Sequence, residues 1–363
     1  MSRIKILSFF SGGGFLDLGF EKAGFDTVWS NEYDTVFSEI YAQGLTSWAK
    51  SENINKTFKI TNNNPVEKID SETIIDEAFK GNKPEIFGMI GGPPCQDFSL
   101  NGKRNGFDGE RGKLTHIYIN KIKEIKPSFF LMENVPGLVG LKHAKPIFNK
   151  LVRELEEDYY VEKIKLNALE YGVPQSRERI FVVGFFKNLL VRNHQDFKWP
   201  APKYPNALKT YNWPKLNDFG KKIGKPTSIP LELCVQSCLK KDNEKITNID
   251  EYFKFKNNKK KRIAIKEGDT KRQSFKRLHR YRYSPTTSYG NNEVHLHPYE
   301  DRRISVREAL RIQGVPDTYI ISPEINMTKK FKVISNGVPM PLAYEIAKSI
   351  LQYIKENFNG HLG

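Results

Sequence analysis

The chain has 363 residues, with 58 Lys+Arg and 42 Asp+Glu, so its net charge is +16 when histidine is neutral. The length suits one large domain or two unequal ones, and the sequence lacks the apolar run of about 18 residues that a membrane span needs. Three cysteines are too few for a disulfide framework and suit a reducing cytoplasm, so we expect a cytoplasmic protein without a membrane partner. The positive charge favours an anionic partner, nucleic acid first.

Strand and helix patterns alternate through the first 184 residues. We predict strands at residues 4–10, 25–30, 85–90, 128–132, 161–166 and 180–185. Helices are predicted at residues 16–23, from residue 31 through 40, and at residues 114–125 and 147–155. This alternation indicates an α/β fold, in which a mostly parallel sheet has helices on both faces. Such sheets bind ligands at the carboxyl ends of their strands.

A Phe-Ser-Gly-Gly-Gly turn at residues 10–14 follows the first strand. Glycines there let the backbone approach a nucleotide-like ligand closely, although a purely structural tight turn is an equal alternative. Asp17 stands where a dinucleotide-binding fingerprint would have its third glycine, which weakens a dehydrogenase interpretation. Glu32 lies 20 residues after Gly12, just past the second strand, where a carboxylate can accept both hydroxyls of a ribose. Taken alone, Glu32 is better explained as a surface acid in a loop, and only the glycine-rich turn and Glu32 together favour a ligand site.

A Gly-Gly-Pro-Pro-Cys-Gln sequence at residues 91–96 follows the third strand. The two prolines fix the backbone just before Cys95, which makes this thiol a candidate nucleophile at the carboxyl end of a strand. A buried, inert cysteine is the alternative. Residues 99–113 combine glycines with Lys and Arg, which suggests a mobile cationic lid or an ordinary flexible loop.

Three further polar side chains are predicted at the same edge of the sheet. Glu133 follows the strand at residues 128–132, so it should emerge beside Cys95. Arg177 and Arg179 precede the strand at residues 180–185, and alternation along a strand would put both on one face. Structural salt bridges are an equally good explanation for this arginine pair.

The positive charge is concentrated in the middle of the chain. Residues 1–184 carry a net charge of −1, residues 185–300 carry +14, and residues 301–363 carry +3. A lysine-rich genome would spread lysine evenly, so this asymmetry favours a functional basic segment. Dense clusters lie at residues 259–262 and 271–277, and residues 280–283 alternate arginine with tyrosine, which suits phosphate pairing and stacking. A solvated charge run remains the alternative for any single cluster.

The basic segment, residues 190–300, is rich in Pro and Asn, and helical spacing returns only at residues 305–312 and 341–354. Cys234 and Cys238 lie four residues apart on a predicted helix, without a second ligand pair nearby. The histidines also lack the spacing of a metal-binding set, so we expect no metal.

These motifs, in this order, resemble the DNA (cytosine-5)-methyltransferase family of the bacterial restriction-modification type. The matching sequences are residues 10–14, 31–32, 93–96, 133–135 and 175–179, followed by residues 303–309, 313–317 and 336–339. The resemblance covers about residues 1–186 and 295–355. It implies a Rossmann-like S-adenosylmethionine-dependent methyltransferase domain at residues 1–188, a smaller, loop-rich target-recognition domain at 189–300, and a return segment at 301–363 that completes the catalytic domain.

The resemblance also implies a reaction, namely methyl transfer to carbon 5 of cytosine while Cys95 is bonded to carbon 6. Glu133 would hold or protonate ring nitrogen 3, Arg177 would contact the base carbonyl or order the site, and Arg179 would support it. Glu32 would bind the ribose of S-adenosylmethionine, and Tyr33 would stack on its adenine. The cofactor pocket implied in this way consists of Phe10, Gly12, Gly13, Gly14, Glu32, Tyr33, Pro94, Leu114, Asn336 and Val338.

Double-stranded DNA is the implied partner of a monomeric bacterial enzyme that associates with the nucleoid when on DNA. Cytosine must leave the duplex before it can react, which costs a few kcal/mol, and Asn101 or a neighbour would fill the gap. Base recognition is assigned to the basic segment. The residues implied to contact DNA are Gln96, Ser99, Asn101, Arg104, Lys271, Arg272, Arg280, Arg282, Thr286 and Thr287.

The sequence departs from the family pattern in places. Phe15 and Ser335 replace glycines that the family usually has, and residues 62–65 (Asn-Asn-Asn-Pro) stand where many members have an acid near the adenine amino group. Three other functions stay open, namely an inactive DNA-binding relative, a methyltransferase that acts on transfer RNA, and a nicotinamide oxidoreductase. The basic segment favours DNA over transfer RNA, and the oxidoreductase leaves the Pro-Pro-Cys motif unexplained.

Overall fold

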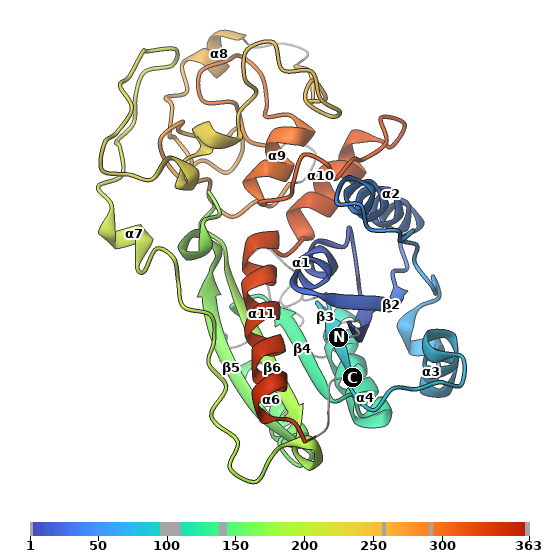
Figure 1. Cartoon of the computed structure of the whole chain (residues 1–363). Coiled ribbons are helices and arrows are strands. Elements are labelled where there is room, and N and C mark those ends of the chain that lie inside the picture. The colour runs from blue at the N-terminus through green and yellow to red at the C-terminus, as the bar shows by residue number, and fades with distance from the viewer. Residues whose placement is uncertain (1–2, 95–109, 138–143, 256–258, 290–292, 360–363) are drawn as a thin grey trace.

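A six-stranded sheet lies at the centre of the computed structural model, which describes residues 3–94, 110–137, 144–255, 259–289 and 293–359 (Figure 1). The strand order is β2-β1-β3-β4-β6-β5. The strands are β1 (Ile4–Phe9), β2 (Phe25–Asn31), β3 (Phe87–Gly91), β4 (Phe129–Asn134), β5 (Tyr159–Asn167) and β6 (Glu178–Phe186). Within the described residues, β6 runs antiparallel to both of its neighbours and the other pairs are parallel, so only β6 is reversed. The predicted α/β fold with a mostly parallel sheet is confirmed.

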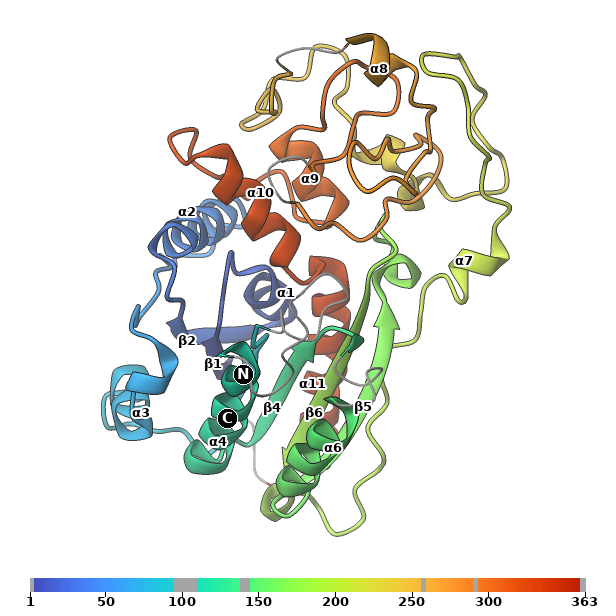
Figure 2. The ribbon, with the colours of Figure 1, turned by 180° about the vertical axis from the view of Figure 1, so that it is seen from behind.

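Helices cover both faces of this sheet. One face carries α1 (Phe15–Ala23) and α11 (Met340–Asn357), and the other carries α3 (Ser71–Phe79), α4 (Glu110–Ile125) and α6 (Ala144–Leu155) (Figures 1 and 2). All residues of β3 and β4 are buried, as expected for strands covered from both sides. Gly19 on α1 meets Ala343 on α11 so closely that an added Cβ would lie 2.6 Å from the alanine Cβ. The C-terminal helix is therefore packed against the first helix of the chain.

Two strands at the site are longer than predicted. β4 continues to Asn134 because Glu133 and Asn134 pair with Phe181 and Ile180 of β6. β6 begins at Glu178, so Arg179 lies within the strand. Helix α2 (Thr35–Ser51) also runs well past residue 40, and the side chain of Asp34 caps its N-terminus. Pairing with a neighbouring strand extends both strands beyond what local periodicity indicates, since Glu178 and Arg179 of β6 pair with Asn167 and Leu166 of β5.

A third group of helices packs above α1, formed by α2, α9 (Val306–Ile312) and α10 (Met327–Asn336). Tyr319, between α9 and α10, is fully buried there, and its hydroxyl donates to the carbonyls of Gly13 (2.6 Å) and Ile40 (3.1 Å). Its ring fills the space beside Gly44, where any Cβ would overlap it. Tyr319, from the C-terminal part of the chain, thus fixes the backbone of the glycine-rich turn at Gly13.

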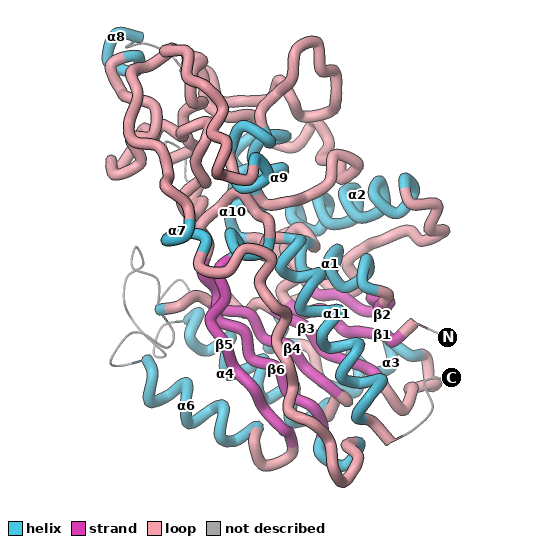
Figure 3. The backbone as a smooth tube through the Cα atoms, turned by 60° about the vertical axis from the view of Figure 1, so that its left-hand side comes forward, coloured by secondary structure: helices cyan, strands magenta, loops and turns pink. Residues whose placement is uncertain are grey.

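The loop-rich segment, residues 190–305, consists mostly of loops in its described parts (Figure 3). Its α-helices there are the short α7 (Ala207–Thr210) and α8 (Lys259–Ile263). Cys234 and Cys238 lie in two 3₁₀ turns, η6 (Leu231–Leu233) with its cap and η7 (Val235–Cys238), so the α-helix predicted for them is wrong. Cys234 itself has an extended backbone (φ −105°, ψ 141°) between the two turns, so no continuous helix contains both cysteines.

Buried arginines hold this segment together. Arg277 is fully buried and donates to the backbone carbonyls of Ile265, Arg262 and His297. Arg262 pairs with Asp301 at 2.9 Å. Arg277 satisfies buried backbone carbonyls and Arg262 neutralises Asp301, so part of the basic charge stabilises the fold itself.

Three histidines of the loop-rich segment are buried, namely His279, His295 and His297. Burial lowers the pKa of His279 from 6.5 to about 4 and the pKa values of His295 and His297 to about 3. A folded-state pKa below the unfolded value adds stability above pH about 6.5, and this stability is lost as the pH falls toward 4.

We therefore expect the thermal unfolding midpoint to fall as the pH is lowered from 6.5 to 4.5. Replacing His295 by Asn should make this fall shallower, because one neutral buried imidazole no longer has to be protonated on unfolding. Replacing His116, which is exposed on α4, by Asn should leave the pH dependence unchanged. Melting curves followed by circular dichroism test this, and an unchanged slope for His295→Asn would contradict it.

Candidate active site

One cavity of about 900 Å³ is lined by residues at the carboxyl ends of β1, β2, β3 and β4. It brings together most of the residues that the sequence indicated. The predicted residues that line it are Phe10, Gly12, Gly13, Glu32, Tyr33, Pro94, Leu114, Glu133, Arg177, Arg179, Thr286, Thr287, Asn336 and Val338. Gly14 is not among its lining residues. It caps α1 in the left-handed conformation (φ 76°), and a Cβ there would meet Tyr41 and Leu45 at 2.7 to 2.8 Å.

The glycine-rich turn is fixed by side chains from its surroundings. Phe10 adopts φ 54°, a strained value for a residue other than glycine, and its ring packs near Tyr118. The Glu32 carboxylate accepts the Gly12 N–H at 2.9 Å and the Asp34 N–H at 2.8 Å. Burial raises the pKa of Glu32. Each Glu32 oxygen keeps a free lone pair, so this carboxylate shapes the turn and can still accept a ligand hydroxyl.

Asp17 accepts two buried hydrogen bonds, which explains why an acid follows the glycine-rich turn. Its carboxylate lies fully buried in the first turn of α1 and accepts hydrogen bonds from Ser8 (2.9 Å) and Tyr41 (3.0 Å). Burial raises its pKa to about 6. A third glycine at this position would leave both hydroxyls without this acceptor.

One end of the cavity is lined by residues that the sequence did not assign to the cofactor pocket. Pro65, Val66 and Glu67 line it next to the exposed ring of Tyr33, which is 68% accessible. Asn31 at the end of β2 donates to the carbonyls of Asn62 and Asn64 and so fixes this loop. The only hint in the sequence was the position of the Asn-Asn-Asn-Pro stretch.

At the other end of the cavity, Glu133 and Arg179 form a close pair. The Arg179 Nε lies 2.8 Å from a Glu133 carboxylate oxygen, and both side chains are only 11% exposed. Burial raises the pKa of the Glu133 carboxyl, although the charges of Arg179 and Arg177 act in the opposite direction. A raised pKa makes it easier for a buried acid to hold a proton and deliver it to a substrate.

Arg177 is buried among backbone carbonyls. Its guanidinium donates to Ser335 O (2.8 Å) and Gly337 O (3.0 Å), and its Nη1 lies 3.4 Å from Thr287 O. Its Nε, also buried, has no hydrogen-bond partner among the described residues. Arg177 therefore ties the start of β6 to the loop at Thr287 and to the last motif of the chain.

The backbone leading to the predicted nucleophile reaches the same cavity. Gly92, Pro93 and Pro94 line it, and a Cβ on Gly92 would lie 3.0 Å from a Glu133 oxygen. The next residue is Cys95, which lies outside the described residues. The predicted DNA-contacting residues Gln96, Ser99, Asn101 and Arg104 also lie outside them.

The remaining predicted DNA contacts differ in how accessible they are. Lys271 and Arg272 are exposed, and Arg272 lies 3.5 Å from Asp269. Arg280 is engaged inside the segment, since its guanidinium donates to buried Glu267 at 2.7 and 2.9 Å. The prediction that Arg280 serves DNA therefore conflicts with its pairing.

Two threonines and one arginine complete this set. Thr287 is buried, within 3.5 Å of the amide groups of Gln175 and Gln313, whereas Thr286 is exposed and donates to Ser176 O. Arg282 is half-buried beside Thr286 in a second, smaller cavity. Thr286 and Arg282 are therefore better placed than Thr287 to meet a ligand.

Neither a metal-ligand cluster nor a membrane-spanning helix occurs in the described residues. No group of three or more His, Cys, Asp or Glu side chains there is arranged to hold a metal ion. No helix in the same part of the chain has the length and apolar character that crossing a membrane requires.

Comparisons with known proteins agree with this geometry. The family model for C-5 cytosine-specific DNA methylase matches residues 4–352. The Type II methyltransferase M.NmeDI of Neisseria meningitidis serogroup C is 41% identical, over 98% of this chain and 85% of its own length. M.FnuDI of Fusobacterium nucleatum is 34% identical, over 97% of this chain and 96% of its own length. A crystal structure of a DNA modification methyltransferase encoded within an E. coli prophage superposes with a TM-score of 0.68 at 29% identity, covering 97% of this chain and all of its own. The chain therefore belongs to the C-5 cytosine-specific DNA methylase family, and the predicted DNA (cytosine-5)-methyltransferase activity is confirmed at the level of that family.

Proposed function

We propose that this chain is the methyltransferase of a restriction-modification system, and that it methylates carbon 5 of cytosine within one specific sequence of duplex DNA. The proposal rests on one cavity that joins the glycine-rich turn to the Glu133–Arg179 pair, so a methyl donor and a cytosine can meet inside it. Its volume of about 900 Å³ lies toward the upper end of the range for ligand sites. The Type II names of the relatives support the restriction-modification assignment.

S-adenosylmethionine fits the residues at the turn end. Glu32 offers a carboxylate for the ribose hydroxyls, and exposed Tyr33 with Pro65 and Val66 offers apolar surface for adenine. Asn336 and Val338, from the far end of the chain, close the same pocket. The bound cofactor would supply the methyl group.

The catalytic steps assigned to this chain concern the cytosine ring. Cys95 forms a bond from its sulfur to carbon 6, and the displaced ring electrons are taken up at nitrogen 3, where Glu133 supplies a proton. Carbon 5 then has the electron density to accept the methyl group. A base, which we take to be water, then removes the carbon-5 proton, the Cys95 sulfur leaves as a thiolate, and nitrogen 3 returns its proton to Glu133, which restores the aromatic ring. Buried Glu133, whose pKa is raised, suits this proton transfer.

We assign the contact with the base carbonyl to Arg179 rather than to Arg177. Arg179 lies beside Glu133 in the cavity, whereas the guanidinium of Arg177 is directed at the backbone carbonyls of Thr287 and of the segment at residues 335–337. Arg177 then positions the site, and Arg179 acts on the substrate.

We further propose that residues 189–300 recognise the target and that 301–363 complete the catalytic domain. The exposed lysines and arginines of residues 189–300 support the assignment of this part to DNA binding. The hydrophobic core, however, runs without a break from α2 through Val235 and Leu278 to α9, so the two parts are packed as one body.

Bisulfite sequencing of DNA from cells that express the chain tests the proposed function directly. We expect conversion to fail at one cytosine within one short sequence and to proceed elsewhere. Complete conversion, together with methyl transfer to purified transfer RNA, would replace duplex DNA by transfer RNA as the substrate. No methyl transfer to either nucleic acid would favour an inactive DNA-binding relative.

Glu32→Gln is expected to weaken S-adenosylmethionine binding about 10- to 100-fold, because a charged acceptor for the ribose is lost. Isothermal titration calorimetry gives the dissociation constant. Glu39→Gln, an exposed change on α2 a few residues away, is the matched control and should bind as the wild type does. Equal affinity of both variants would remove Glu32 from the cofactor site.

Neutralising exposed lysines of the basic segment should weaken DNA binding. The suitable residues are Lys260, Lys261 and Lys271, which are exposed, because Arg262, Arg277 and Arg280 hold the segment together. Changing all three to Gln should lower the slope of log affinity against log salt by up to about 3, roughly 0.9 for each phosphate that is no longer neutralised.

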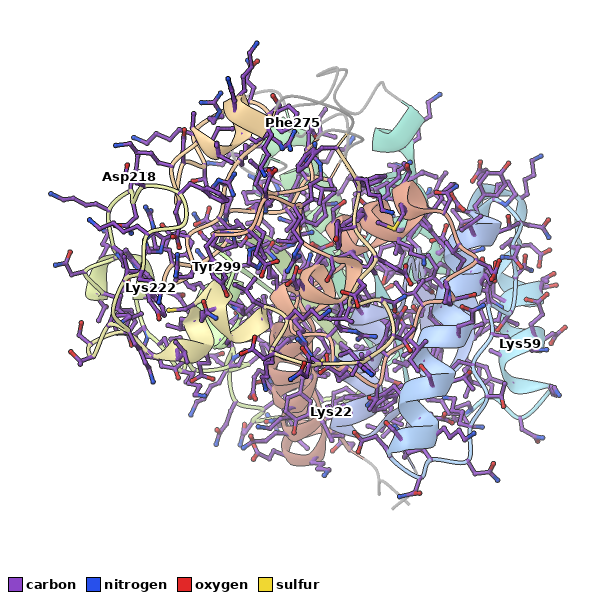
Figure 4. All side chains as sticks on the ribbon, turned by 90° about the horizontal axis from the view of Figure 1, so that it is seen from above. Lys22, Lys59, Asp218, Lys222, Phe275 and Tyr299 are labelled. Atoms are coloured by element: carbon purple, nitrogen blue, oxygen red, sulfur yellow. The ribbon has the colours of Figure 1, made fainter. Side chains whose placement is uncertain are left out.

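The control for this experiment is a triple Gln variant of Lys50, Lys80 and Lys163, which are exposed on the catalytic half. It removes the same charge and should leave the salt slope nearly unchanged. Figure 4 shows how far the loop-rich segment extends from that half, with Lys222 and Lys59 on opposite sides of the molecule. Equal slopes for the two triple variants would count against a DNA-binding role for these lysines.

A further inference from the structure

A second cavity lies beside the catalytic one. It has a volume of about 320 Å³ and shares Thr286 with the catalytic cavity as part of its wall. We call it the Arg282 pocket; its lining residues come from three loops: Ser176, Gly268, Thr270, His279, Arg282, Tyr283, Pro285 and Thr286.

Backbone hydrogen bonds fix the walls of the Arg282 pocket. Ser176 N donates to Ser284 O (2.9 Å), Ser284 N donates to Pro174 O (2.8 Å), and the Thr286 hydroxyl donates to Ser176 O (2.8 Å). The loop before β6 is thereby joined to residues 284–286 of the loop-rich segment. The pocket is preformed, and its position relative to Glu133 and Arg179 is set by β6.

The chemistry of the pocket is that of an anion site. Among the described residues that line it, Arg282 is the one positive side chain, and hydroxyls are present without any carboxylate. In the part of the chain that the structure describes, the Arg282 guanidinium has no hydrogen-bond or ion-pair partner and only lies 5.8 Å from the Tyr283 ring. The nearby acid Glu267 is already occupied by Arg280. An arginine with free donors beside hydroxyls, in a concave site, matches a phosphate group.

The position of the pocket beside the catalytic cavity indicates which DNA phosphate it could bind. A flipped nucleotide rotates about its own backbone, so the phosphates that flank it must be held while the base is inside the catalytic cavity. The Arg282 pocket adjoins that cavity through Thr286. We propose that the Arg282 pocket binds a DNA phosphate that flanks the extruded cytosine and so stabilises the flipped state. This inference rests on the proposed function.

The test uses duplexes that contain the target sequence, each with a single neutral methylphosphonate at one phosphate near the target cytosine. The rate of methyl transfer (kcat/KM) is measured for the wild type and for Arg282→Gln. With the wild type, one flanking position should lower kcat/KM by about 10- to 100-fold. With Arg282→Gln, kcat/KM on unmodified DNA should already be lower by a similar factor. A methylphosphonate at the flanking position should then cause no further decrease. Arg282→Lys, which keeps the charge, should restore part of the rate.

Arg272→Gln is the matched control, since it removes an exposed arginine of the same segment that lies outside the pocket. It should keep the full methylphosphonate penalty at the flanking position. Unchanged S-adenosylmethionine affinity of Arg282→Gln shows that the variant is folded. If Arg282→Gln retains the wild-type penalty at every position, the proposal is overturned. A changed base preference with an unchanged phosphate profile would also overturn it, because Arg282 would then read a base.

These outcomes are separate from the failure of the proposed function. A wild-type enzyme that methylates no duplex at all would refute the proposed function before any variant is made. If the wild type methylates its site, and the wild type and Arg282→Gln respond alike to methylphosphonates at every position, only the proposal for the Arg282 pocket is refuted.

Discussion

Cys95→Ser is expected to reduce methyl transfer by about 10³-fold or more and to abolish covalent trapping on DNA that contains 5-fluorocytosine at the target. In the proposed mechanism the sulfur must add to carbon 6, and a serine hydroxyl at neutral pH is almost never ionised and is a far weaker nucleophile. A fluorine at carbon 5 cannot leave as a proton does, so an enzyme that uses Cys95 stays attached to the DNA. Denaturing gel electrophoresis of the protein–DNA adduct and tritium transfer from labelled cofactor measure the two effects.

Cys234→Ser is the control for this substitution. Cys234 is buried in the loop-rich segment, and burial raises the pKa of its thiol to about 12, so it cannot supply a thiolate. This variant should form the adduct as the wild type does. An adduct formed by Cys95→Ser would show that another group attacks the ring.

Arg177→Met and Arg179→Met are expected to fail in different ways. Arg179→Met should lower kcat by about 100-fold, because a positive donor beside Glu133 is lost from the reacting end of the cavity. Its free energy of unfolding should fall less than that of Arg177→Met, because the buried Glu133 left without its partner can take up a proton. Arg177→Met should instead lower the free energy of unfolding by about 2–5 kcal/mol, since buried carbonyls of Ser335 and Gly337 lose their donor.

Urea unfolding followed by fluorescence, together with single-turnover methyl transfer, separates the two effects. Arg177→Lys should recover part of the stability, because a single ammonium can reach one of the carbonyls. If Arg177→Met is as stable as the wild type and loses only kcat, the base contact returns to Arg177, as the sequence motif implied.

The fold was largely predictable because local patterns specify its elements. The apolar runs of β3 and β4 and the period of α4 are visible without any neighbour, and all six predicted strands are present. The ends of β4 and β6 were not predictable from local periodicity, because each is held by a neighbouring strand: Glu133 and Asn134 of β4 pair with distant β6, and Glu178 and Arg179 of β6 pair with β5. The α-helix predicted near Cys234 was wrong because the spacing of two cysteines does not specify a helix.

The sequence by itself determined the family, since ordered short motifs place a cysteine, an acid and two arginines in the sequence positions that the family has. Tertiary structure decided which charges remain available. Arg177, Arg277 and Arg280 look alike as sequence letters, yet all three are tied to carbonyls or to Glu267, whereas half-buried Arg282 keeps its donors. Burial and pairing depend on residues from distant parts of the chain, and a charge reaches a ligand only where the fold leaves it unpaired.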